Sequence, residues 1–211
     1  MRVVFLGPPG SGKGTQAERL SAILRISKIS TGDALRESIK RGDELGRKAK
    51  VYVEKGELVP DDIILALVEQ LIDEAGGRFL LDGFPRNLNQ AKSLDEYLSG
   101  RDWSLDRVIY LRVDRGEIVN RLSSRRVCSQ CGAVYNLIYN PPTVEGRCDK
   151  CGGALEQRRD DTEDVILRRL DVYERETAPL IAYYAERGLV EEIDGTGAVE
   201  EVFERIRRAL E

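Results

Sequence analysis

The stretch at residues 7–15, GPPGSGKGT, decides how the beginning of this 211-residue chain folds. It follows Arg2–Leu6, RVVFL, a short apolar run rich in β-branched residues that is typical of a buried strand. Residues 15–24 have the spacing of a helix. The stretch itself matches the pattern G-x-x-x-x-G-K, whose backbone N–H groups turn toward phosphate oxygens at the positive end of the following helix. We therefore expect a phosphate-binding loop between a strand and a helix.

The composition excludes several classes of chemistry. The chain contains no histidine, so catalytic triads, metal sites and general bases that depend on imidazole are excluded. Its net charge of −4 argues against general binding to nucleic acid. No apolar run approaches the roughly 18 residues needed to span a bilayer, and the first residues lack the features of a signal peptide. We expect a cytoplasmic chain with no membrane partner.

Strand-like and helix-like segments alternate along most of the chain. Alternation of this kind predicts an α/β fold in which helices flank a parallel sheet, and with the loop at residues 7–15 it indicates the P-loop NTPase type. Residues 127–157 break the alternation with four cysteines, paired prolines and several glycines. Further strands are predicted within residues 78–86, 106–113 and 189–194. Helices are predicted within residues 30–42, 43–56, 60–77, 114–126 and 161–187, and in a last segment that ends at Leu210. Pro60 and an Asp cap are expected at the start of the helix within residues 60–77.

The four cysteines form two Cys-x2-Cys pairs separated by sixteen residues. Pairs at this spacing indicate a four-thiolate zinc site, and a disulfide framework is the alternative that a cytosolic chain disfavours. Such a zinc would be structural, because all its ligands come from the protein, and it would stabilise a segment too small to form its own core. Gly132 and Gly152 follow the pairs and would permit turns that aim N–H groups at the sulfurs. The predicted zinc ligands are Cys128, Cys131, Cys148 and Cys151.

The position after Lys13 separates this loop from many others of its class. Gly14 stands where Ser or Thr is common, and glycine has no side chain that could bind Mg²⁺. The hydroxyl of Thr15, one residue later, is the natural substitute. The resulting pattern GKGT resembles the nucleoside monophosphate kinases.

Other motifs extend this resemblance over nearly the whole chain. ISTGDALR at residues 29–36, LLDGFPR at residues 80–86 with NQA after it, and RRDD at residues 158–161 follow one another as in the adenylate kinase family. The resemblance implies a monomer that catalyses the reversible, Mg-dependent reaction ATP + AMP = 2 ADP and so maintains the balance of adenine nucleotides. It also implies a core of residues 1–29, 60–121 and 160–211, an AMP-binding insertion of residues 30–59, and a zinc-bearing lid of residues 122–159.

The resemblance assigns side chains to two nucleotide sites. Arginine suits bidentate contacts with phosphate, and the amide of Gln90 can both donate to and accept from one adenine edge. Arg121 would stack on the ATP base, and Thr15 and Asp82 would hold Mg²⁺, the latter through water. The AMP phosphate would attack in line without a protein nucleophile, so catalysis would rest on positioning and charge from Lys13, Arg86, Arg125, Arg158 and Arg169. The implied ATP contacts are Gly10, Ser11, Gly12, Lys13, Gly14, Thr15, Arg121, Arg125, Val134, Tyr135 and Gly197. The implied AMP contacts are Thr31, Arg36, Glu57, Leu58, Val59, Gly83, Phe84, Pro85, Arg86, Gln90, Arg158 and Arg169.

Several roles stay open at this point. Asp160 and Asp161 either cap the following helix or tie down arginines of the lid. Tyr139 is expected only to pack within the lid. Arg126, Arg159 and Arg168 are expected to be solvated.

Three alternative functions also stay open. The first is another nucleoside monophosphate kinase of the UMP/CMP type, whose members tend to differ at Thr31 and Gln90. The second is a regulatory GTPase, although the chain lacks an Asn-Lys-x-Asp motif. The third is a zinc ribbon that binds nucleic acid, which would need a basic face and would leave most of the chain unexplained.

Overall fold

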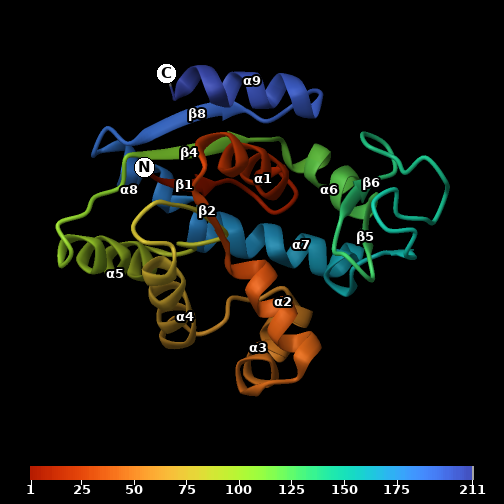
Figure 1. The fold of residues 1–211 in the computed structure, drawn as a ribbon, viewed down its shortest axis with the longest axis horizontal. Coiled ribbons are helices and arrows are strands. Elements are labelled where there is room, and N and C mark those ends of the chain that lie inside the picture. Colours follow the sequence, from red (N-terminus) through yellow and green to blue (C-terminus); the bar gives the residue numbers. More distant parts are fainter. Residues whose placement is uncertain (211) are drawn as a thin grey trace.

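A five-stranded parallel sheet forms the centre of the computed structural model, which describes residues 1–210 (Figure 1). The parallel α/β architecture predicted from the sequence is confirmed. One strand, β2, was not predicted, because its sequence SKIS contains a single buried apolar residue, Ile29. The strands are β1 (Arg2–Leu6), β2 (Ser27–Ser30), β3 (Phe79–Asp82), β4 (Arg107–Arg112) and β8 (Val190–Asp194), in the order β2-β3-β1-β4-β8.

Helices cover both faces of this sheet. Successive residues of a strand point to opposite faces, and β1 shows this directly. Val3 and Phe5 pack with α1 (Lys13–Leu24) and α9 (Val199–Ala209). Val4 and Leu6 belong to a second cluster on the other face, which is covered by α4 (Asp61–Glu74), α5 (Leu88–Ser99) and α8 (Pro179–Ala185). Among residues 1–210, no helix is long and apolar enough to cross a membrane.

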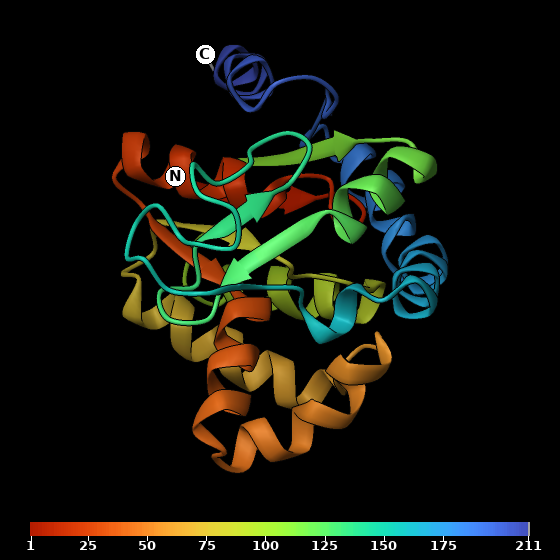
Figure 2. The ribbon, with the colours of Figure 1, turned by 90° about the vertical axis from the view of Figure 1, so that its right-hand side faces the viewer.

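Two segments project from the sheet. Helices α2 (Thr31–Arg41) and α3 (Glu44–Lys55) form a lobe at the bottom of Figure 1, within the predicted insertion of residues 30–59. On the right of Figure 1, after α6 (Arg115–Ser123), an antiparallel sheet of order β6-β5-β7 lies within the predicted lid. Figure 2 shows the lid strands facing the viewer, above the α2–α3 lobe. The lid strands are β5 (Arg125–Cys128), β6 (Val134–Asn136) and β7 (Leu155–Glu156).

The segment predicted as one helix over residues 161–187 is interrupted. A short 3₁₀ turn, Arg159–Asp161, precedes α7 (Glu163–Val172), and a π-helical turn, Tyr173–Thr177, separates α7 from α8. Pro179 begins α8, and proline lacks the N–H that an uninterrupted α-helix would use there. The break lets the Thr177 hydroxyl donate to the backbone oxygen of Arg86, at 2.7 Å.

One prediction about a helix end is wrong, and one of the roles left open for another helix end is excluded. Pro60 occupies the N-cap position of α4, and the carboxylate of Asp61 binds side chains of α5 instead of capping its own helix. Thr162 is the N-cap of α7, so Asp160 and Asp161 do not cap it. Helix α5 itself was not predicted, although a crossover between two parallel strands requires a connection of about this length.

Candidate active site

Three glycines shape the predicted phosphate-binding loop. Gly7, Gly10 and Gly12 have φ angles of 144°, 83° and 96°, which residues with a Cβ rarely adopt, and α1 begins directly after Gly12. The ammonium of Lys13 donates to the backbone oxygens of Gly7, at 2.7 Å, and Pro8, at 2.8 Å. The loss of water around this group lowers the pKa of Lys13 to about 8. An anionic ligand would restore the charged form, so the loop is suited to a polyphosphate.

The predicted magnesium ligands lie beside this loop. Asp82 ends β3, which is paired with β1, and its carboxylate lies so close to Gly14 that a Cβ there would be 3.3 Å from Oδ2. Glycine at residue 14 thus leaves room for the carboxylate, and the next residue, Thr15, has an exposed side chain. A hydroxyl and a carboxylate are oxygen ligands of the kind that Mg²⁺ prefers. Thr15 and Asp82 therefore fit Mg²⁺.

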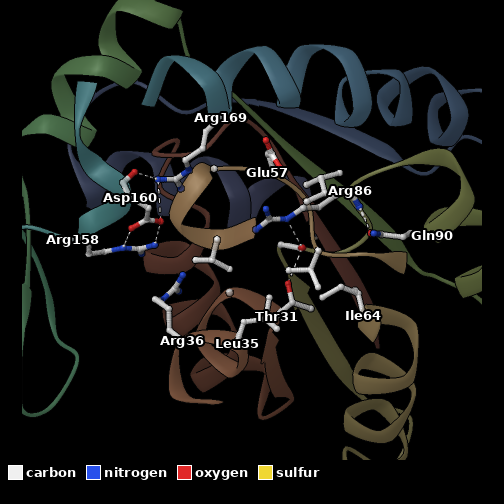
Figure 3. A pocket seen from close by; sticks show the side chains of 16 residues that line it. Thr31, Leu35, Arg36, Glu57, Ile64, Arg86, Gln90, Arg158, Asp160 and Arg169 are labelled. Atoms are coloured by element: carbon white, nitrogen blue, oxygen red, sulfur yellow. Dashed lines mark hydrogen bonds and ion pairs between the residues drawn. The ribbon is translucent and has the colours of Figure 1, made fainter. Parts of the chain in front are cut away.

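A second cavity lies between the α2–α3 lobe and the end of β3 (Figure 3). The Thr31 hydroxyl donates to the backbone oxygen of Gly83, at 2.8 Å, which fixes the start of α2 against the turn after β3. Apolar side chains on the inner faces of the helices, including Leu35 and Ile64, also line the cavity and were not predicted, because such residues look like ordinary core positions in the sequence. Of the predicted AMP contacts, the cavity is lined by Thr31, Arg36, Glu57, Leu58, Val59, Gly83, Arg86, Gln90, Arg158 and Arg169.

Two predicted AMP contacts lie elsewhere. Phe84 is 1% exposed and packs in the hydrophobic core, and Pro85 is also buried. Their side chains therefore shape the turn that carries Arg86 and do not line the cavity.

The cavity wall carries an excess of positive charge. Desolvation at the cavity lowers the pKa of Arg86, and the positive charges of Arg36 and Arg158 lower it further. Desolvation also lowers the pKa of Arg36 and brings that of Arg169 to about 10. Arginine does not lose its proton in proteins, so a lowered pKa means that the charged form lacks compensation. A phosphate group is a ligand that would supply this compensation.

Two carboxylates hold the arginines that come from the lid and from α7. The Asp161 carboxylate is completely buried and accepts from Arg125 Nε, at 2.7 Å, and from Arg169 Nη1, at 3.1 Å. The Asp160 carboxylate accepts from Arg158 Nε, at 2.8 Å. Of the two roles that the sequence left open for Asp160 and Asp161, the structure shows the second, in which they hold arginines in place. Arg159 and Arg168 are exposed, as expected, whereas Arg126 is half-buried and donates to the backbone oxygen of Arg125, at 2.7 Å.

Arg121, near the end of α6, contacts the phosphate-binding loop, where its Nη1 donates to the backbone oxygen of Ser11 at 3.5 Å. It donates from Nε to Glu117, at 2.7 Å, and from Nη1 to the backbone oxygen of Gly195, at 3.0 Å. Tyr139 extends from the lid over the Arg121 guanidinium, 5.4 Å from its ring centre, and its hydroxyl donates to Glu117 at 2.8 Å. The expectation that Tyr139 only packs within the lid is therefore wrong, because it joins the lid to α6.

Three other predicted ATP contacts have distinct surroundings. Val134 is 53% exposed on the lid. Gly197 has a φ of 101° and is exposed in the turn before α9. The Tyr135 side chain is buried and lies against the Cys148 thiol, 3.5 Å away, so any contact of this residue with ATP falls to its backbone.

The four cysteines come together as predicted. Their Sγ atoms all lie within 4.8 Å of one another, with 3.4 Å between Cys128 and Cys151 and 3.5 Å between Cys131 and Cys148. Sulfurs bound tetrahedrally to one Zn²⁺ lie about 3.8 Å apart, whereas disulfide sulfurs lie about 2.05 Å apart. All four cysteines are free, so the cluster fits structural zinc. Gly132 and Gly152 have φ angles of 73° and 74°, and their N–H groups close the predicted turns by binding the backbone oxygens of Cys128 and Cys148.

Backbone N–H groups stabilise the thiolate form of these cysteines. Hydrogen bonds from the backbone of Cys131 and Gln130 lower the pKa of Cys128. Deprotonated sulfur is the form that binds zinc.

A phosphate-binding loop beside an arginine-lined cavity defines a P-loop phosphotransferase that acts on nucleotides. The family model described as adenylate kinase matches residues 5–189, and the chain belongs to this family. A curated protein named adenylate kinase from Moorella thermoacetica is 54% identical over 212 residues, covering 100% of this chain and 98% of its own length. Similar proteins of the same name occur in Carboxydothermus hydrogenoformans, 52% identical with 100% of both chains covered, and in Archaeoglobus fulgidus, 49% identical with 100% of this chain and 98% of the relative covered.

Proposed function

We propose that this chain transfers the γ-phosphoryl group of Mg-bound ATP to AMP, in the reversible reaction ATP + AMP = 2 ADP, and so maintains the balance of adenine nucleotides. One observation carries the proposal: two phosphate-binding regions follow adjacent strands of the sheet. The loop with Lys13 follows β1, and the turn with Arg86 follows β3. The carboxyl ends of neighbouring parallel strands meet at one edge of the sheet, which favours direct transfer between two bound nucleotides.

ATP would bind at the loop of residues 7–15. The N–H groups of the loop and the first turn of α1 would cradle its phosphates, with the Lys13 ammonium beside them. Arg121, whose guanidinium carbon lies 5.4 Å from the centre of the Tyr139 ring, has a planar group of the shape to stack on the base. When bound with ATP, Mg²⁺ supplies positive charge and orients the phosphates, and Thr15 and Asp82 would hold it.

AMP would bind in the second cavity, with its phosphate at the arginine end. Arg36 and Arg86 would fix the phosphate, and Arg158 and Arg169 lie at the same end of the cavity in Figure 3. An AMP phosphate oxygen is already charged and needs no general base. The protein would contribute orientation, fixed positive charge and exclusion of water.

The two projecting segments have the contacts expected of parts that close over the nucleotides. Residues 30–59 would form an AMP-binding domain and residues 122–159 a lid, hinged on a core of residues 1–29, 60–121 and 160–211. The two segments already approach each other through an ion pair between Arg159 and Glu54, at 3.4 Å. Closure would bring Arg125 and Arg158 toward the transferring phosphoryl group and remove water.

We further propose that the chain works as a monomer in the cytoplasm. Both nucleotide sites lie within one chain, which supports a monomer. A zinc site made of four thiolates is most secure where thiols stay reduced, which supports the cytoplasm.

A single assay tests the proposed reaction against a UMP/CMP-type activity. Purified protein with ATP and Mg²⁺ is mixed in turn with AMP, GMP, CMP and UMP, and formation of ADP is followed. AMP should exceed the other acceptors by about a hundredfold or more in kcat/KM, as expected where buried polar groups read the base. A preference for UMP or CMP would support the alternative instead.

Asp161→Asn should lower kcat for ADP formation by about a hundredfold, the scale on which misplaced catalytic groups reduce rates. The change removes the carboxylate charge that Arg125 and Arg169 share. Asp164→Asn makes the same change at an exposed residue in the first turn of α7 and should retain full activity. An Asp161→Asn enzyme with wild-type kcat would show that these arginines do not depend on this anchor.

A further inference from the structure

A hydrogen-bonded cluster lies beneath the end of the cavity that carries Gln90. Asp61, in the first turn of α4, accepts three side-chain hydrogen bonds from the start of α5. Asn87 Nδ2 and Gln90 Nε2 donate to Oδ1, at 2.9 and 2.7 Å, and Asn89 Nδ2 donates to Oδ2, at 2.8 Å. None of the contacts proposed above for ATP or AMP includes Asp61, so the cluster needs an explanation of its own.

These contacts determine which way the Gln90 amide is turned. Its Oε1 accepts from the backbone N–H of Arg86, at 2.8 Å, while its Nε2 donates to Asp61. A backbone N–H only donates and a carboxylate only accepts. A reversed amide would place N–H against N–H at Arg86 and oxygen against a carboxylate at Asp61. Only one orientation is therefore compatible with both neighbours.

The fixed amide leaves a defined pattern for a ligand. A primary amide has two N–H donors and two acceptor lone pairs on its oxygen. One of each is used within the protein, so one N–H and one lone pair remain, and Gln90 lines the cavity while being only 2% exposed. On its Watson–Crick edge adenine presents the 6-amino donor beside the N1 acceptor, whereas a 6-oxopurine presents the reverse order there, the 6-oxo acceptor beside the N1–H donor. A donor beside an acceptor in fixed order matches adenine and opposes the 6-oxopurine.

Asp61 is well suited to hold this orientation. Burial alone would raise its pKa, but the hydrogen bonds from Asn89, Gln90 and Asn87 outweigh burial and hold the pKa of Asp61 below its ordinary value. The carboxylate is therefore ionised at neutral pH and accepts strong, charge-assisted hydrogen bonds. The backbone oxygen of the same residue, Arg86, accepts from the Thr177 hydroxyl at 2.7 Å. The Gln90 amide, which would face the base, is thus hydrogen-bonded to the backbone of Arg86, which would face the phosphate.

We propose that Asp61 is a positioning residue that determines base specificity: by fixing the direction of the Gln90 amide, it selects 6-aminopurine over 6-oxopurine monophosphates as phosphate acceptors. This inference rests on the proposed function, because it assumes that the base of the acceptor lies against Gln90. It goes further by assigning the rejection of 6-oxopurines to a residue that does not touch the nucleotide. With an unrestrained amide, Gln90 could turn its NH₂ group toward the 6-oxo oxygen and the discrimination would weaken.

The test is Asp61→Asn, measured with AMP and with inosine monophosphate as acceptors. Asparagine keeps the size of the side chain but offers one acceptor oxygen instead of two, and its own NH₂ can support a reversed Gln90. The ratio of kcat/KM for AMP to that for inosine monophosphate should fall about tenfold, the scale of one lost hydrogen bond to a charged group. The loss should lie in a higher KM for AMP, with kcat and the KM for ATP nearly unchanged.

The neighbouring residue provides a matched control. Asp62→Asn makes the same chemical change in the same turn of α4, at an exposed residue, and should keep wild-type selectivity. A purely structural role of Asp61 would lower kcat for both acceptors together and lower the melting temperature, without changing their ratio. That result would overturn the inference.

A double-mutant cycle completes the design. In a Gln90→Leu background, which has no amide to orient, Asp61→Asn should change the selectivity ratio no further. Independent, additive effects of the two substitutions would overturn the role of Asp61. Failure of the wild-type protein to phosphorylate AMP would instead overturn the proposed function, so the two failures are distinguishable.

Discussion

Lys13→Met is expected to lower the rate of ATP–AMP phosphoryl transfer by about a thousandfold or more, the range seen when a cation is removed from a phosphoryl-transfer site. The substitution removes the only cationic side chain of the phosphate-binding loop while keeping an unbranched chain of similar length. The ammonium binds the backbone oxygens of Gly7 and Pro8 at present, so it is positioned to move onto phosphate oxygens at little cost. The rate of ADP formation at saturating ATP and AMP is the quantity to measure.

Lys92→Met provides the comparison. Lys92 is exposed on α5, so its replacement makes the same change in charge without touching either phosphate-binding region. The melting temperature of Lys92→Met should match that of the wild type, because surface substitutions rarely change stability by more than about 0.5 kcal/mol. That of Lys13→Met should also stay close, because the lost hydrogen bonds of the ammonium are offset by the removal of a desolvated charge. A Lys13→Met protein with full activity would refute the assigned role.

The pKa of Lys13 gives this prediction a second readout. The free loop holds the pKa at about 8, below the ordinary value of 10.5, and bound phosphates would raise it again. Above about pH 8, ATP binding must therefore take up a proton, and affinity should fall with rising pH by up to about tenfold per unit. The affinity of the Lys13→Met variant should lose this dependence. Calorimetric titration with ATP at pH 7 and pH 9 measures both quantities.

The elements that the sequence predicted are those whose pattern is local. β1 is a continuous apolar run and the loop after it has fixed glycine spacing, so both were predicted from a few adjacent residues. β2 was missed because its side chains are mostly polar and its place in the sheet depends on pairing with β3. The π-helical turn Tyr173–Thr177 has no local pattern that predicts it, although Pro179 marks the place where the next helix begins.

The residues of the site also divide into those that a local motif predicts and those that only the folded chain brings together. Arg36, Arg86 and Gln90 stand in motifs with recognisable spacing, and the structure brings all three to one cavity. The contribution of Asp61 could not be predicted, because the sequence shows an ordinary helix-capping aspartate and only the folded chain places it 2.7 Å from Gln90. The sequence likewise predicts only packing for Tyr139, because its contact with Glu117 joins two segments that lie apart in the sequence.

Cys128→Ser should reduce bound zinc well below one ion per chain and lower the melting temperature of the lid far more than it lowers kcat. The lid has almost no apolar core of its own, since the buried cluster there consists of Cys128, Tyr135 and Cys148. Side chains that would ordinarily form such a core, such as Ile138 and Val144, are 59% and 56% exposed. The free energy that folds this segment must therefore come largely from the metal, and structural zinc sites provide about 10–16 kcal/mol in small domains.

The chemical step should be affected less, because no cysteine lines the arginine-rich cavity. Assayed at low temperature with added zinc, the variant should keep kcat within about tenfold of the wild type, since misfolding and not lost chemistry limits it. A chelator should lower the melting temperature of the wild-type protein in the same way, and added zinc should reverse the effect, whereas the variant should respond to neither. Zinc content and thermal unfolding, measured on the same samples, separate the possibilities. If the variant still binds one zinc per chain and unfolds at the wild-type temperature, Cys128 is not a ligand.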